Sequence, residues 1–199
     1  MPAIGQPAPS FTLPRDGGTD VSLADYAGQM VVLYFYPKDD TPGCTTEAID
    51  FSAEAEAFAA AGAVVLGVSR DTVKKHEKFR DKHGLKVALL ADEDGAVCEA
   101  YGVWVEKSMY GRTYMGIERT TFLIGRDGKI ARVWDKVKVK DHAAEVLEHL
   151  GNRLQGLASE PKLLTRVLGW ALVNWLLDML ALYVFIRAFG GEVAPDALI

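Results

Sequence analysis

One cysteine in this chain stands where a helix should begin. It lies in YFYPKDDTPGCTTEA (34–48), where a strongly apolar segment runs into a polar loop. Pro42 suits the first turn of a helix because its missing N–H is not needed there, and Thr41 fits the N-cap before it. Cys44 then lies in the first turn, where free backbone N–H groups and the helix dipole stabilise a thiolate. Gly43 leaves room for a small molecule beside the backbone, so the residues predict a reactive thiol with an oxyanion-binding floor. The alternative is a buried cysteine that serves only as a small hydrophobe.

The chain has no second cysteine where a C-x-x-C redox motif needs one. Glu47 stands in that place, which argues against a disulfide reductase of the thioredoxin type. Glu47 either tunes the thiol or is an ordinary acid that stabilises the first turns of the helix. The other thiol of the chain, Cys98, lies in DEDGAVCEAYG, a short predicted helix, and we expect a structural role for it.

The segments around Cys44 predict the elements that position it. MVVLYFY (30–36) and GAVVLGVS (62–69) are apolar runs typical of buried strands, and the alanine-rich segment between them predicts a helix. Strand, helix and strand in this order favour a parallel pair with a right-handed crossover. A helix, a strand, a helical turn, a hairpin and a closing helix are predicted after them at 71–84, 86–92, 94–101, 120–134 and 141–151. The predicted class is α/β, a mixed central sheet flanked by helices, which matches the order of a thioredoxin-like fold.

Composition narrows the class of protein. The chain has 199 residues, of which 49% are hydrophobic and 25% charged, so most of it should be globular. The net charge of −5 argues against nucleic-acid binding, which needs a basic face. Two cysteines are too few for a secreted disulfide scaffold, and MPAIGQPAPSF is not a signal peptide. We therefore expect a reducing, cytoplasmic location for the globular part.

Other polar signals are weak. The histidines stand in charged helical stretches, so we expect a solvated surface location rather than metal binding for His76, His83, His142 and His149. DEDG (92–95) lacks the rest of a calcium loop, and GRDGK has the wrong spacing for a phosphate loop. These residues therefore indicate neither a metal site nor a phosphate-binding loop.

Several motifs together resemble one family. Pro37, Thr41 and Cys44 stand in the P-x-x-x-T-x-x-C pattern of peroxiredoxins. The longer string YFYPKDDTPGCTTEA resembles the subfamily called peroxiredoxin Q or bacterioferritin comigratory protein. The strings PAPSFTLP, GVSRD, LLADEDGAVCEAYGVW and GIERTTFLI extend this resemblance over about residues 3–150.

The resemblance implies a thiol peroxidase that reduces hydrogen peroxide and organic hydroperoxides and needs no metal or organic cofactor. The Cys44 thiolate would attack a peroxide oxygen and become a sulfenic acid. Thr41 would hydrogen-bond the bound peroxide and the sulfur, and Pro37 would shield the pocket from water. Arg119, in GIERTTFLI, matches the family's arginine, which lies near the sulfur and holds the peroxide.

The resolving cysteine of many relatives is missing here. They carry it at the position of Ile49 or in the following helix around Phe79 and Arg80. We therefore expect a one-cysteine cycle with thioredoxin, glutaredoxin or glutathione as the external reductant, and Cys98 would resolve Cys44 only through local unfolding or from another subunit. The alternatives are a non-catalytic interaction or chaperone protein on the same fold and, less favoured, a disulfide oxidoreductase.

The C-terminal part differs in composition from the rest. We predict a catalytic domain over 1–152, a linker over 153–162 and a hydrophobic helix with a tail over 163–199. Val167–Ile186 has one ionisable residue, Asp178, and is about long enough to span a bilayer, which would anchor a cytoplasmic domain. A helix packed in an oligomer, with Asn174 and Asp178 on its paired face, and a helix lying on a membrane are the alternatives. The sequence leaves monomer or homodimer open.

Overall fold

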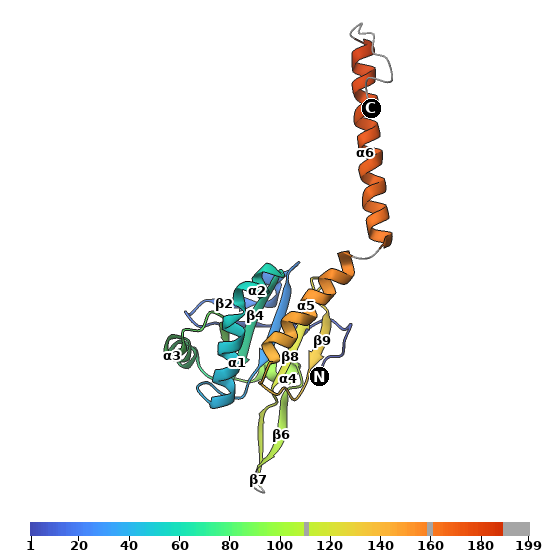
Figure 1. Cartoon of the computed structure of the whole chain (residues 1–199). Helices are drawn as coiled ribbons and strands as arrows, with labels where there is room; N and C mark the ends of the chain where they lie inside the picture. The colour runs from blue at the N-terminus through green and yellow to red at the C-terminus, as the bar shows by residue number, and fades with distance from the viewer. Residues whose placement is uncertain (110–111, 159–160, 189–199) are drawn as a thin grey trace. The chain divides into compact units, whose positions relative to one another are not determined.

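The computed structural model describes residues 1–109, 112–158 and 161–188. The chain divides into two compact units, Met1–Leu150 and Gly151–Ile199. Figure 1 shows the elements of both units along the chain.

The first unit is built on a mixed five-stranded sheet. Its strands lie in the order β5-β4-β3-β8-β9, with β3–β4 and β4–β5 parallel and β8 antiparallel to both of its neighbours. The bounds are β3 Met30–Phe35, β4 Ala63–Ser69, β5 Ala88–Ala91, β8 Thr120–Ile124 and β9 Ile130–Trp134. Every residue of the central strand β3 is buried, as its unbroken apolar run predicts. The predicted α/β class and the mixed sheet are confirmed.

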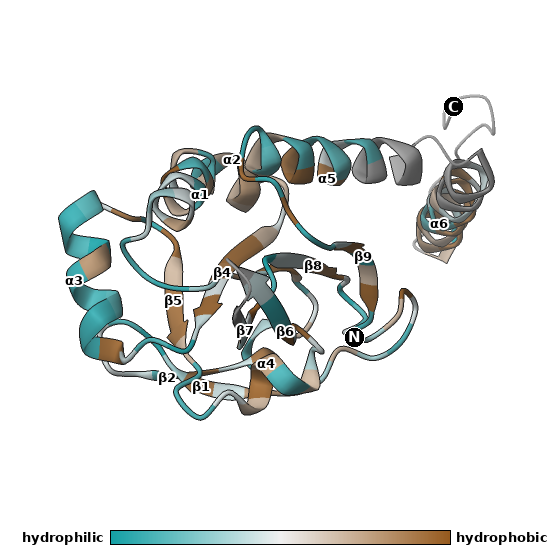
Figure 2. Cartoon of the chain, turned by 90° about the horizontal axis from the view of Figure 1, so that it is seen from below, coloured by the Kyte–Doolittle hydropathy of each residue, from teal (hydrophilic) through white to brown (hydrophobic). Residues whose placement is uncertain are grey.

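Helices cover both faces of this sheet. In Figure 2, α1, α2 and the first part of α5 lie along one face and α4 lies along the other, while α3 runs beside β5. The helices are η1 Leu23–Tyr26, α1 Pro42–Ala53, α2 Ala55–Ala60, α3 Val73–His83, α4 Ala96–Ala100 and α5 His142–Ala158. The helix expected between the first two strands is divided at Glu54, and α5 continues through residues 153–158, which we expected to belong to a linker.

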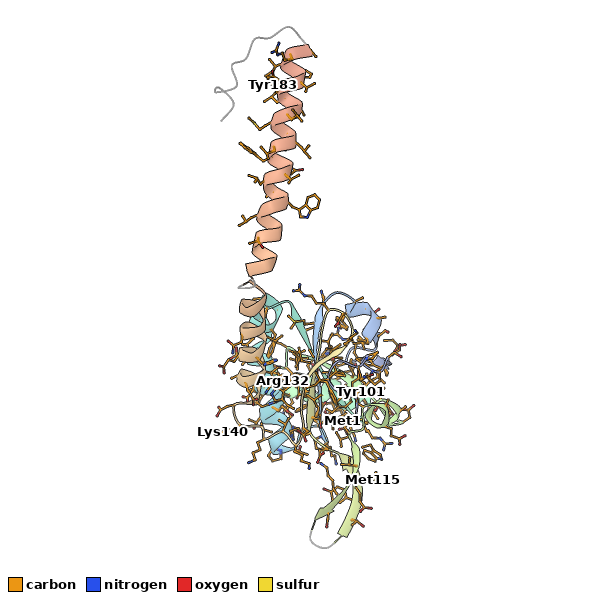
Figure 3. All side chains as sticks on the ribbon, turned by 90° about the vertical axis from the view of Figure 1, so that its right-hand side faces the viewer. Met1, Tyr101, Met115, Arg132, Lys140 and Tyr183 are labelled. Atoms are coloured by element: carbon orange, nitrogen blue, oxygen red, sulfur yellow. The ribbon has the colours of Figure 1, made fainter. Side chains whose placement is uncertain are left out.

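Two hairpins add to the predicted elements. β1 Thr12–Pro14 pairs with β2 Asp20–Ser22, and β6 Trp104–Met109 pairs with β7 Arg112–Ile117, all antiparallel. Figure 3 shows the second hairpin with Met115 on it. Its strands mix charged, aromatic and small residues, so they lack the apolar run that marked the central strands.

The expectation of a solvated surface location is wrong for two histidines. The exposed fraction of His76 is 0% and that of His142 is 3%. The charged residues around His76 lie on the outer side of α3, whereas His76 and Phe79, one turn apart, face inward. A charged stretch therefore indicated a surface helix but said nothing of its inner side.

The second unit contains one long helix, α6 Pro161–Ala188. Within it, Leu168–Ala188 has 21 residues and a mean hydropathy of 1.6, which suffices in length and composition to cross a membrane. None of that stretch is buried against other described residues. In Figure 3 its side chains project to both sides of the helix as seen in that view.

Candidate active site

Cys44 lies in the first turn of α1, as the sequence predicts. β3 ends at Phe35, a loop follows, and α1 begins at Pro42 with Thr41 as its N-cap in an extended conformation. The first hydrogen bond of the helix runs from the Thr45 N–H to the Thr41 carbonyl at 2.8 Å. The exposed fraction of Cys44 is only 1%, so the thiol is held in the interior, close to the N–H groups at the helix start.

Arg119 reaches this sulfur from the neighbouring strand. It comes directly before β8, and β8 pairs with β3 so that Thr120 lies opposite Phe35. The register therefore places Arg119 beside the end of β3, where the loop to Cys44 starts. Arg119 Nη2 donates a hydrogen bond to Cys44 Sγ at 3.1 Å. A guanidinium at this distance stabilises a thiolate and any oxyanion that forms beside it.

Glu47 forms an ion pair with the same guanidinium. Its Oε2 accepts a hydrogen bond from Arg119 Nη1, while Oε1 has no partner among the described residues. Burial raises the pKa of Glu47 to about 7, and the positive charge of Arg119 opposes that rise. Glu47 thus sets the orientation of Arg119, and the two nitrogens of one planar group hold a carboxyl on one side and the sulfur on the other.

The Thr41 hydroxyl does not cap α1. Thr41 Oγ1 donates to the Lys38 carbonyl at 3.1 Å and accepts no N–H from α1. Its hydroxyl proton is therefore engaged, and the oxygen retains lone pairs that can accept a hydrogen bond from a ligand.

Pro37 lies at the edge of a groove. It is exposed and, with Trp104, Lys107 and Ile117 from the β6–β7 hairpin and others, lines a groove of about 480 Å³. The structure brings Arg119 into contact with Cys44, and it places Pro37 and Thr41 in the loop before the thiol without a direct hydrogen bond to it.

Lys107 is a site neighbour that the sequence did not single out. Its Nζ donates to the Ile117 carbonyl at 2.6 Å. Burial lowers the pKa of Lys107; Glu118 and Cys44 oppose this shift, whereas Arg119 reinforces it. The pairing of β6 with β7 brings Lys107 close to Arg119 and Cys44, and no local sequence motif indicates that pairing.

Cys98 has the surroundings of a structural cysteine. Its exposed fraction is 0%, and its backbone N–H donates to Asp92 Oδ2 at 2.7 Å. Burial, together with Asp92, raises the pKa of this thiol, so it resists ionisation. It lies in α4, across the sheet from α1 (Figure 2). Among the described residues no group of three or more His, Cys, Asp and Glu side chains could hold a metal ion.

Comparison with known proteins places these features in context. The model of the AhpC/TSA family matches residues 4–133. The chain is 55% identical to the putative peroxiredoxin bcp of Coxiella burnetii over 147 residues, which cover 74% of this chain and 97% of that protein. It is 54% identical to peroxiredoxin Bcp of Bacillus subtilis, over 74% of this chain and 94% of the relative.

Solved structures show the same likeness. A structure of the bacterioferritin comigratory protein of Xanthomonas campestris, determined to study its alkyl peroxide reduction activity, matches with a TM-score of 0.69 and 48% identity, covering 72% of this chain and 91% of that one. A PrxQ mutant of Xylella fastidiosa matches with a TM-score of 0.72 and 43% identity, covering 80% of this chain and 99% of that one.

Proposed function

Because the chain belongs to the AhpC/TSA family and is a relative of the Bcp peroxiredoxins, we propose that it is a thiol-dependent peroxidase with Cys44 as its peroxidatic cysteine. Its substrates are hydrogen peroxide and organic hydroperoxides. The observation that carries this proposal is the 3.1 Å hydrogen bond from Arg119 Nη2 to Cys44 Sγ at the start of α1. A cysteine that served only packing would need neither a buried guanidinium nor a helix terminus beside it.

The oxidative step follows from this geometry. The Cys44 thiolate attacks the O–H oxygen of the hydroperoxide, and the S–O bond forms as the O–O bond breaks. The second oxygen departs as hydroxide or alkoxide and takes a proton from solvent water to become water or an alcohol. Arg119 stabilises the negative charge as it moves from sulfur to the departing oxygen. The Thr41 oxygen accepts a hydrogen bond from the peroxide O–H and holds it in line with the sulfur. The product is a sulfenic acid at Cys44.

The reductive step uses an external thiol. Neither Ile49 nor the segment around Phe79 and Arg80, where the resemblance places a resolving cysteine, holds a thiol. Cys98 is buried on the other side of the sheet. A thiolate from thioredoxin, glutaredoxin or glutathione attacks the sulfenic sulfur, releases water and forms a mixed disulfide. A second thiol then exchanges with this disulfide and returns Cys44 to its reduced form.

A stoichiometric oxidation tests the peroxidase proposal. The full chain is mixed with one equivalent of hydrogen peroxide, and the modified residue is located by mass spectrometry after trapping of sulfenic acid. We expect rapid oxidation of Cys44 in the native protein. A native Cys44 thiol that survives excess peroxide contradicts the proposal.

The one-cysteine cycle has its own test. Cys98→Ser should leave turnover with a thioredoxin-type reductant largely unchanged, whereas Cys44→Ser should abolish it. Collapse of activity in Cys98→Ser, together with a Cys44–Cys98 disulfide in the oxidised native protein, would contradict the one-cysteine cycle while leaving Cys44 as the peroxidatic residue.

We also propose that α6 anchors the cytoplasmic enzyme to a lipid bilayer. Leu168–Ala188 has the length and hydropathy of a spanning helix, and its large apolar side chains are exposed. Lys162 and Arg166 before this stretch outnumber Arg187 at its end, which favours a cytoplasmic N-terminal side. The competing assembly is a soluble monomer or homodimer in which α6 is covered by protein.

Fractionation distinguishes the two assemblies. The full chain should remain in the membrane pellet after washing with alkaline carbonate and enter solution in detergent, whereas a version that ends at residue 155 should stay in the supernatant. A full chain that is soluble without detergent contradicts the anchor.

A further inference from the structure

The loop that carries Thr41 into the site is held in a strained conformation. This loop, residues 37–41, is part of the connection between β3, which ends at Phe35, and α1, which begins at Pro42. Asp40 has φ of 57°, in the left-handed region that non-glycine residues rarely adopt. Such a residue persists only where its surroundings fix it. The Thr41 side chain does not cap α1 and bonds only within the loop, to the Lys38 carbonyl, so the contacts that tie the loop to the rest of the fold come from other residues.

The contacts that fix the loop come largely from α3 and the residues just before it. The Asp39 N–H donates to Asp71 Oδ2 at 2.8 Å, and His76 Nδ1 lies 2.8 Å from Asp39 Oδ2. On the next residue, the Asp40 carboxylate accepts from Lys82 Nζ at 2.5 Å and meets His83 Nε2 at 2.9 Å. Two consecutive loop residues are thus tied to one helix.

His76 is the buried centre of this arrangement. Its exposed fraction is 0%, and its Nε2 lies 3.2 Å from the Leu90 carbonyl in β5. The Leu90 carbonyl and the Asp39 carboxylate both accept, so each ring nitrogen carries a hydrogen and donates to one of them. Tyr36 completes the set, since its hydroxyl donates to Asp39 Oδ1 at 2.7 Å. The ring therefore fixes the loop aspartate against the sheet.

We propose that His76 is a positioning residue for peroxide reduction, which acts through Asp39 to hold the 37–41 loop and thereby place the Thr41 oxygen beside Cys44. This inference rests on the proposed peroxidase function and deepens it. His76 touches neither sulfur nor peroxide in this account. It determines whether the hydroxyl that orients the peroxide stands where the reaction needs it.

Two substitutions separate this role from general support of the fold. Asparagine places its amide nitrogen near the position of Nδ1, so His76→Asn keeps the donor to Asp39 and loses the contact to Leu90. Glutamine places its amide nitrogen near Nε2, so His76→Gln keeps the contact to Leu90 and loses the one to Asp39. Both are neutral amides in the same buried position, and Lys74→Ala, an exposed change on α3, is the control.

The quantity to measure is the second-order rate constant for oxidation of Cys44 by hydrogen peroxide, with the melting temperature of each variant recorded. We expect His76→Gln to lose on the order of 10- to 100-fold in this rate constant, as for a displaced reacting group. His76→Asn should keep most of it, and Lys74→Ala all of it. Equal losses in the two amide variants, or no loss in His76→Gln, overturn the proposal.

A double substitution tests the connection to Thr41. If His76 acts by placing Thr41, then His76→Gln should slow oxidation far less in a Thr41→Val background than in the native one. Additive losses overturn the proposal.

Should both amide variants fail to fold, Tyr36→Phe is the second test, because it removes one hydrogen bond to Asp39 at nearly constant volume. An unchanged oxidation rate in Tyr36→Phe also overturns the proposal. Native Cys44 that peroxide does not oxidise refutes the peroxidase function itself, which is a different result.

Discussion

Arg119 links a carboxyl and a thiol through one rigid group. Its two terminal nitrogens donate in different directions, Nη1 to Glu47 and Nη2 to Cys44 Sγ. The exposed side-chain fraction of Arg119 is 14% and that of Glu47 is 1%, so water screens the arrangement little. An added Cβ at Gly43 would lie 3.4 Å from Nη2, which leaves little space for a side chain beside the guanidinium. We therefore expect the reactivity of Cys44 to depend on the orientation of this guanidinium as much as on its charge.

Arg119→Lys tests the orientation directly. A lysine keeps the positive charge but has a single nitrogen that cannot serve Glu47 and Cys44 in the same way. We expect the rate constant for oxidation of Cys44 by peroxide to fall on the order of 100-fold, as for loss of one oxyanion-stabilising donor. Rapid quenching with a thiol-alkylating reagent measures it. Arg126→Lys, at an exposed hairpin turn, is the control, and a native-like rate in Arg119→Lys would refute the bidentate role.

Glu47→Gln should change how stability depends on pH. The carboxyl has a pKa of 4.5 when unperturbed and about 7 in the fold, so between these values the folded chain holds a proton that the unfolded chain has lost. Stability from this group is therefore complete below pH 4.5 and declines as pH rises to about 7. Glutamine cannot ionise, so the free energy of unfolding of the variant should not show this decline, which amounts to about 3 kcal/mol in the native chain. Urea unfolding across this range measures it, with exposed Glu56→Gln as control; parallel native and Glu47→Gln curves would contradict the burial of an ionisable group.

Elements with a strong local signal were predictable, and contacts set by pairing were not. Pro42 and the apolar run before it indicated where β3 ends and α1 begins, so Cys44 was placed correctly from its neighbours alone. Arg119 was found only through the family resemblance, because its approach to Cys44 depends on the antiparallel register of β8 with β3. Lys107 was missed for the same reason. His76 was predicted at the surface because most residues of α3 are charged, and the sequence around it gave no sign of the buried inner face.

The packing of β3 on β4 makes a prediction at the level of elements. Gly67 of β4 pairs with Tyr34 of β3, and an added Cβ at Gly67 would lie 2.6 Å from Tyr34 Cζ. Gly67→Ala should therefore destabilise the fold by about 1–3 kcal/mol through overpacking. Gly151→Ala is the matched comparison, because it lies in α5 with nothing within 4 Å, and it should stabilise by up to about 1 kcal/mol. Denaturant unfolding measures both, and effects of the same sign would contradict the close contact of Tyr34 with Gly67.

The central sheet separates the two thiols at the level of the whole molecule. α1 with Cys44 covers one face and α4 with Cys98 the other (Figure 2). Residue types alone do not show such a separation, since they place Cys98 in a helix without saying which face that helix covers. With Cys98 buried, a disulfide within one chain would require the sheet or its covering helices to open, which favours an external reductant.

Asp178 provides the last test, which concerns what surrounds α6. Its carboxylate lies near the middle of the apolar stretch and accepts a hydrogen bond from Asn174 Nδ2 at 3.4 Å. In a bilayer such a charge costs about 3 kcal/mol at the centre of a spanning helix. Asp178→Leu should therefore raise the fraction of full-length chain that resists carbonate extraction, whereas Trp175→Leu on the same helix should change it little.

If α6 is instead covered by a partner subunit through the Asn174–Asp178 face, Asp178→Leu should leave the membrane fraction unchanged and alter the oligomeric state measured by light scattering. A rise in the membrane fraction at constant oligomeric state supports the bilayer, because removal of a charge lowers the cost of insertion and does nothing for a polar contact between proteins.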